Sequence, residues 1–175
     1  CVVATNDALG ASTSNHGDGI YSAASILRVE QATIARNRGE GIRCASGTTT
    51  ITNSILWANG DDVAGTVELG YSCIQNGDNN GTNGCVMVDP LFADTTYYHL
   101  LSKAGYYSGG FFSGGTWIGQ GVSQLTSPLI DAGHPSWPWS AEPQPNGHRA
   151  NMGAYGNTEV ASKKWAVPGM IFMVR

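Results

Sequence analysis

The chain has 175 residues, enough for one domain of ordinary size, and 24 of them are glycine. Only 13% of the residues are charged, about half of the roughly 25% typical of globular proteins, which favours a turn-rich β protein. The 9 Lys and Arg residues are outnumbered by 13 Asp and Glu residues, and no apolar stretch approaches the roughly 20 residues of a membrane span. The sequence therefore predicts neither nucleic-acid binding nor a membrane span.

A sequence repeat of about 22 residues fills the first half of the chain. The segment Ile26–Arg38 aligns with Thr48–Gly60 at this offset. A third copy follows after a further 18 residues, and a truncated copy at Val3 and Asn6 precedes the others. The aligned apolar residues are Val29 with Ile51 and Leu69, and Ile34 with Leu56 and Ile74.

Within each copy the apolar residues alternate and then change parity, near Gln31 in one copy and near Asn53 in the next. Short strands of period 2, separated by bends and repeated every 18–22 residues, are typical of a parallel β-solenoid with stacked coils. A β-sandwich would also have short strands, but it does not explain a fixed period. We therefore expect an all-β parallel solenoid.

Stacking of the copies assigns a place to each repeated residue. Ile51 and Leu56 are expected inside, where equivalent apolar residues pile on one another. Asn37 and Asn59 are expected at a corner, where their side-chain amides can form a ladder and satisfy turn backbone groups. Arg28 is expected to face solvent, because it alternates with the core residues.

The repeat fades from about residue 86, and the remainder is rich in Gly, Pro and aromatic residues. Three regions are expected: β-coils over 1–88, a C-terminal cap over 89–162, and an apolar tail or linker over 163–175. The first coil begins in mid-strand, so its edge would be open to another strand. This predicts either self-association by end-to-end stacking, with the apolar segment 165–175 as the docking segment, or a longer helix with coils before Cys1.

Several motifs of the second half resemble the last coils of a known group of proteins. They are Asp89-Pro90-Leu91-Phe92, Ser127-Pro128-Leu129-Ile130-Asp131-Ala132-Gly133 and Asn151-Met152-Gly153-Ala154-Tyr155-Gly156-Asn157. In these motifs the chain resembles right-handed parallel β-helix repeat proteins of the bacterial secreted or cell-surface type. The resemblance implies a right-handed parallel β-helix with an irregular C-terminal cap, and an extracellular or cell-surface location.

Two cysteines bracket a polar loop of the third repeat. Cys73 and Cys85 stand on either side of the segment 75–84, which is rich in Asn and Gly. In an oxidising compartment they could form a disulfide bond, and we expect that bond in a secreted protein. Two free thiols are the alternative.

No residue pattern of the chain indicates catalysis or a strong metal site. The four histidines lack ligand spacing, so His134 and His148, which lie near Asp131 in the predicted cap, are interpreted as structural. Asp61, Asp62 and Asp78 lie in predicted loops and could at most bind Ca²⁺ weakly. No cofactor and no catalytic residue are predicted for this chain.

Aromatic residues in Gly-rich and Pro-rich loops of the second half are candidates for sugar stacking. These are Trp137, Trp139, Trp117, Tyr106 and Tyr107, which could instead cover the last coil. Together with the resemblance they predict a structural or adhesive role that involves contact with polysaccharide. The alternative is the non-catalytic C-terminal portion of a polysaccharide lyase or glycoside hydrolase.

Overall fold

A computed structural model describes residues 1–7, 19–109 and 120–165 of the chain. All regular structure in these residues is β strand. The strands are β1 (Val2–Ala4), β2 (Ile20–Ser22), β3 (Ser25–Glu30), β4 (Thr33–Ala35), β5 (Glu40–Thr52), β6 (Ile55–Trp57), β7 (Asp61–Gly70), β8 (Cys73–Ile74), β9 (Tyr106–Tyr107) and β10 (Gln120–Gly121). No helix that could span a membrane is found in the described ranges.

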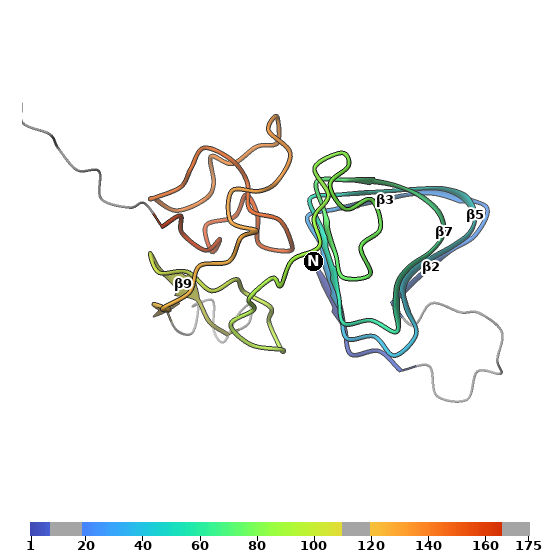
Figure 1. The fold of residues 1–175 in the computed structure, drawn as a ribbon, viewed down its shortest axis with the longest axis horizontal. Helices are drawn as coiled ribbons and strands as arrows, with labels where there is room; N and C mark the ends of the chain where they lie inside the picture. Colours follow the sequence, from blue (N-terminus) through green and yellow to red (C-terminus); the bar gives the residue numbers. More distant parts are fainter. Residues whose placement is uncertain (8–18, 110–119, 166–175) are drawn as a thin grey trace, which may run out of the picture.

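Two parallel sheets hold the strands of the first half. In one, here called the β6 sheet, the order is β1-β4-β6-β8. In the other, the β5 sheet, the long strand β5 pairs with β2 and β3 along one edge and with β7 along the other. Figure 1 shows these strands nearly superposed in projection, because each pairs in parallel with the equivalent strand of the next repeat.

The register of both sheets follows the sequence repeat. Val29 pairs with Ile51 and Ile51 with Leu69 in the β5 sheet, and Ile34 pairs with Leu56 and Leu56 with Ile74 in the β6 sheet. The chain passes from one sheet to the other through bends at which Gln31, Asn53 and Tyr71 have positive φ. Each bend reverses the parity of the alternation, which explains the change of parity in the sequence.

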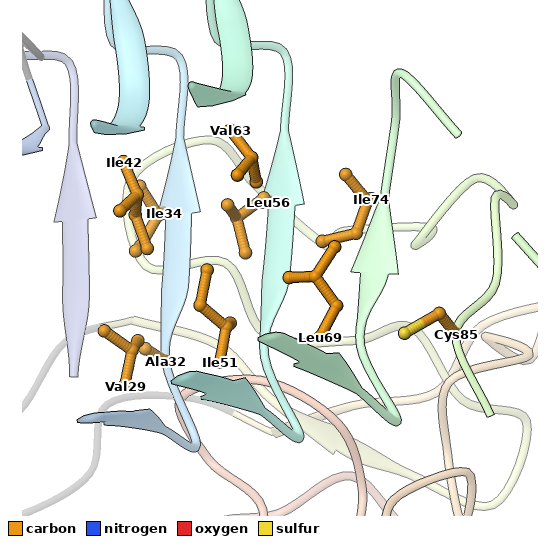
Figure 2. Packing of buried hydrophobic residues seen from close by; sticks show 10 residues of the cluster. All are labelled: Val29, Ala32, Ile34, Ile42, Ile51, Leu56, Val63, Leu69, Ile74 and Cys85. Carbon is orange, nitrogen blue, oxygen red and sulfur yellow. The ribbon is translucent and has the colours of Figure 1, made fainter. Parts of the chain in front are cut away.

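Apolar side chains from the two sheets meet in a shared core (Figure 2). Ile34, Ile51 and Leu56 are fully buried there. The cluster contains Val29, Ala32, Ile34, Ile42, Ile51, Leu56, Val63, Leu69, Ile74 and Cys85. The predicted inward places of Ile51 and Leu56 are thus confirmed.

An asparagine ladder satisfies backbone groups at another bend. The Asn37 side-chain amide donates a hydrogen bond of 2.9 Å to the Asn59 side-chain oxygen, which also accepts from the Asn37 backbone amide at 3.1 Å. Asn6 repeats both contacts with Asn37 one copy earlier. This is the ladder that the repeat predicts. It holds equivalent positions of neighbouring copies in register at this bend.

The C-terminal region, meaning residues 89–109 and 120–165, packs against the outer face of the β6 sheet. Ile55 and Cys73 project from that face into a second core with Leu100, Leu129, Ile130 and Met152. The backbone amide of Ala154 donates to the Thr33 hydroxyl of the same face at 3.1 Å. The β6 sheet is therefore covered on both faces, and Figure 1 shows the C-terminal region beside the strands.

The predicted fold, a right-handed parallel β-helix with a C-terminal cap, is wrong. The described strands form several short sheets, two parallel and one antiparallel pair (β9 with β10), and no closed solenoid joins them. The repeat covers too few copies, because from Gln75 the backbone forms local turns such as Asn80 to Gly77 and Thr82 to Asn79. The C-terminal region covers the outer face of the β6 sheet, whereas a cap would close the open end of a solenoid.

Candidate functional site

The described surface has a hollow of about 600 Å³ on the outer side of the β5 sheet. We call it the Tyr71 groove. It is lined by Thr50, Thr52, Glu68, Leu69, Gly70, Tyr71, Asn79, Asn83 and His134. Most of these side chains carry a hydroxyl, amide, carboxylate or imidazole group, so the groove can form hydrogen bonds in many directions.

The floor of the groove consists of residues that face away from the shared core. Thr50 of β5 pairs with Glu68 of β7, and Thr52 pairs with Gly70. These four residues alternate with the buried Ile51 and Leu69, so strand geometry points them outward. Gly70 adds no side chain at the centre, and a Cβ there would have its nearest neighbour, the Asn83 carbonyl oxygen, at 4.0 Å.

Tyr71 forms one wall, at the bend between β7 and β8. Its φ of 46° turns the chain away from the β5 sheet, and its backbone amide donates to the Asn83 carbonyl at 2.9 Å. The backbone of Gly84 lies so close to the Tyr71 ring that a Cβ at this position would overlap it. Gly84 also has a φ of 73°, so a glycine is required here for two reasons.

His134 brings the C-terminal region into the groove. Its ring meets the Tyr71 ring edge-on, with 4.6 Å between the centroids. Its backbone amide donates to the Asn53 side-chain oxygen at 2.6 Å, and its Nδ1 accepts from the Ser136 amide at 3.1 Å. A neutral imidazole in this arrangement carries its hydrogen on Nε2 and is a donor there.

Arg149 fixes the two walls relative to one another. Its guanidinium donates to the carbonyl oxygens of Ala132 and Gly133, the latter through Nε and the former at 3.1 Å through Nη2. Its Cζ also lies over the Tyr71 ring, 5.6 Å from the centroid. This cation–π contact holds the turn that carries His134 against the end of β7.

The aromatic residues proposed for sugar stacking lie elsewhere on the C-terminal region. Trp137 is half-buried and donates its backbone amide to the His134 carbonyl at 2.9 Å, so it is within one turn of the groove. One face of the half-buried Trp139 ring is stacked on His148, with centroids 4.6 Å apart. Tyr106 and Tyr107 line a separate hollow of about 190 Å³, and Trp117 lies outside the described residues.

The predicted disulfide bond between Cys73 and Cys85 is not formed in this structure, where both are free thiols. Cys73 projects into the second core, while Cys85 belongs to the core between the two sheets. The Cys73 thiol donates to the Val88 carbonyl at 3.2 Å, and burial raises its pKa to about 11. The two side chains therefore serve different cores, which the spacing in the sequence does not reveal.

Asp62, the second residue of the acidic pair Asp61 and Asp62, has a structural role in the described chain. Asp62 is 2% exposed, and its oxygens accept from the Asn59 side chain and from the backbone amides of Gln75 and Asn76. Burial raises its pKa despite these bonds. No group of three His, Cys, Asp or Glu residues suited to a metal ion occurs in the described ranges. Weak Ca²⁺ binding, which Asp78 was also expected to support, stays a prediction.

Two buried carboxylates, Glu142 and Asp131, lie in the C-terminal region. The Glu142 Oε1 atom accepts from the backbone amides of Asn151 and Asn157, each at 2.8 Å. Burial raises the Glu142 pKa to about 7, and the charge of Asp131 adds to this effect. Asp131 in turn pairs with Lys164 at 3.2 Å. These contacts tie together segments of irregular backbone, which gives the two carboxylates a structural role.

Sequence reasoning missed the groove because its residues are far apart in the chain. Glu68 and Tyr71 lie in the third repeat, whereas His134 comes from a segment without periodicity. The available signal was the outward parity of Thr50 and Glu68 beside a glycine at residue 70. Comparison of the chain with protein families, with characterised proteins and with solved structures finds no match.

Proposed function

We propose that this protein contacts polysaccharide through the Tyr71 groove, in a structural or adhesive role outside the cell or at its surface. The observation that carries the proposal is the composition of the groove. Amide, hydroxyl and carboxylate groups surround a hollow walled by Tyr71 and His134. Sugar hydroxyls need many hydrogen-bond partners, and the C–H faces of sugar rings pack on aromatic groups.

The groove favours binding over hydrolysis. Glycoside hydrolysis uses two carboxyl groups on either side of the scissile bond. Among the residues that line the groove, Glu68 alone has a carboxylate. The buried Glu142 already accepts hydrogen bonds from the backbone amides of Asn151 and Asn157. We therefore expect retention of the polysaccharide without turnover.

A substitution at Gly70 tests this proposal. Gly70 has an ordinary φ and open space around a hypothetical Cβ, so Gly70→Phe should fill the groove without backbone strain. The matched control is Glu30→Phe, since Glu30 pairs with Thr52 as Gly70 does but does not line the groove. Pull-down on a panel of insoluble and immobilised polysaccharides should show binding by the parent chain and by Glu30→Phe, and none by Gly70→Phe.

Two outcomes would overturn the proposal. One is a parent chain that binds no polysaccharide of the panel. The other is binding that survives Gly70→Phe unchanged, which would place the contact elsewhere, for example near Trp137 or Trp139. Thermal denaturation of each variant establishes that it is folded.

A further inference from the structure

Negative side chains outnumber lysine and arginine among the residues that line the Tyr71 groove. Of its lining residues, Glu68 carries a carboxylate and is exposed, and none is Lys or Arg. The loop that supplies Asn79 and Asn83 also carries the exposed Asp78. The whole chain has a formal charge of −4, so the general field has the same sign.

None of the ion pairs formed by the described residues joins a guanidinium group to this carboxylate. Arg149 keeps its positive charge, but its Nε and Nη2 already donate to the carbonyl oxygens of Gly133 and Ala132, and its Cζ lies over the Tyr71 ring. Arg28 is in line with Glu68 but two strands away, because it pairs with Thr50 and Thr50 pairs with Glu68. Two strand spacings are about 10 Å, which is close to the Debye length at ~0.1 M salt.

We infer that the groove selects polysaccharides with free amino groups, such as polymers of glucosamine, over polyuronates. A sugar ammonium group placed over the β7 end of the groove forms an ion pair with Glu68. Ring hydroxyls are then within reach of the Thr50, Thr52, Asn79 and Asn83 side chains, which line the same hollow. A uronate carboxylate at the same place meets Glu68, and no lysine or arginine lines the groove to pair with it. This inference rests on the proposed polysaccharide contact.

The test compares three soluble oligosaccharides of equal length. They are a glucosamine oligomer, its N-acetylated counterpart and a galacturonic acid oligomer, titrated into the full chain by calorimetry at about pH 6 and low salt. The glucosamine oligomer should bind up to about fivefold tighter than the acetylated one, which is the upper end of the contribution of one exposed ion pair. The galacturonic acid oligomer should bind weakest, and added salt should reduce the differences.

Variants at two exposed glutamates separate site binding from general charge. Glu68→Gln should bring the affinity for the glucosamine oligomer down to that for the acetylated oligomer. Glu30→Gln removes the same charge from the same face of the sheet, at a residue that does not line the groove, and should leave the preference intact.

The outcomes separate a failure of the amino-sugar inference from a failure of the proposed polysaccharide contact. If the acetylated or galacturonic acid oligomer binds as tightly as the glucosamine oligomer, the amino-sugar inference fails and the groove remains a polysaccharide site. If Glu68→Gln and Glu30→Gln lower the preference equally, the attraction is to net charge and the inference also fails. If no oligosaccharide and no polysaccharide binds, both fail.

Discussion

The backbone amide of His134 donates a hydrogen bond of 2.6 Å to the side-chain oxygen of Asn53, a residue 81 positions earlier in the chain. Asn53 is fully buried and sits with φ of 53° at the bend between β5 and β6. The same residue accepts from Gly153 through its backbone carbonyl at 2.8 Å. One side chain at a bend of the repeat therefore positions a wall of the Tyr71 groove.

Replacement of Asn53 should separate the hydrogen bond from the backbone conformation. Asn53→Gly keeps the positive φ accessible but removes the acceptor for His134, so the free energy of unfolding should fall by about 1–2 kcal/mol. Asn53→Ala removes the same acceptor and adds about 1 kcal/mol of strain, because alanine disfavours this φ. Urea denaturation should rank the alanine variant below the glycine variant. An alanine variant as stable as the glycine variant would contradict the assigned conformation.

Ile51→Asp should be severely destabilising. Ile51 is fully buried between Val29 and Leu69, and a carboxylate there would have no partner. We expect a loss above about 4 kcal/mol in the free energy of unfolding. Arg28→Ala, on the opposite face of the same sheet, should change it by less than about 0.5 kcal/mol. Similar losses in the two variants, measured by denaturant titration, would refute the inward and outward assignment.

Glu142 should make the protein less stable as the pH rises. Its pKa is about 7 in the folded chain against an ordinary value of 4.5, so the folded state holds the proton more tightly. The stabilisation is complete below pH 4.5 and is lost as the pH rises to about 7, a change of roughly 3 kcal/mol. Glu142→Gln keeps an oxygen that accepts from Asn151 and Asn157, and its stability should fall less over this range than that of the parent chain.

His99 contributes a pH dependence of the opposite sign. Burial lowers its pKa from 6.5, so its contribution has the opposite sign and is lost as the pH falls below 6.5. In Glu142→Gln the effects of His99 and of the raised Asp62 pKa remain, so stability should fall less from pH 5 to pH 7 than in the parent chain. Urea denaturation at intervals of pH measures both slopes. Identical slopes for the parent chain and Glu142→Gln would rule out the raised pKa.

The four cysteines should differ sharply in reactivity. Cys1 is exposed, whereas Cys44, Cys73 and Cys85 are buried, and the pKa of about 11 leaves Cys73 almost entirely as the thiol. With a chromogenic disulfide reagent, we expect one thiol to react quickly and the others only after unfolding. Cys1→Ser should abolish the fast reaction. A peptide map without reduction that shows Cys73 joined to Cys85 would contradict the separate cores.

The periodic part of the sequence was sufficient to predict strand pairing but not the arrangement of the whole chain. Alternation and the 22-residue offset placed Ile51, Leu56 and the Asn37–Asn59 ladder correctly, because these contacts join equivalent positions of neighbouring repeats. The same pattern cannot show what lies on the outer face of a strand. The partners of Ile55 and Cys73 there are Leu129, Ile130 and Met152, which belong to no repeat.

For the same reason the Tyr71 groove and the free thiols could not be predicted. Cys73 and Cys85 are close in sequence, yet alternation along β8 turns Cys73 to the outer face while Ile74 faces the shared core. His134 reaches the groove only because Asn53 and Arg149 hold its turn in place. The motifs that suggested a β-helix cap describe local turns, and those turns also fit the side of a sheet.

Coverage of the β6 sheet from both sides makes unfolding of this protein a cooperative event. The central strand β6 contributes Leu56 to one core and Ile55 to the other, so neither core can open without exposing apolar surface on that strand. Amide hydrogens of β4 and β6 should accordingly exchange with solvent only through global unfolding, and with one common free energy of opening. A chain cut after residue 88 would lack the segments that cover the outer face of the β6 sheet, and an exposed apolar face promotes aggregation.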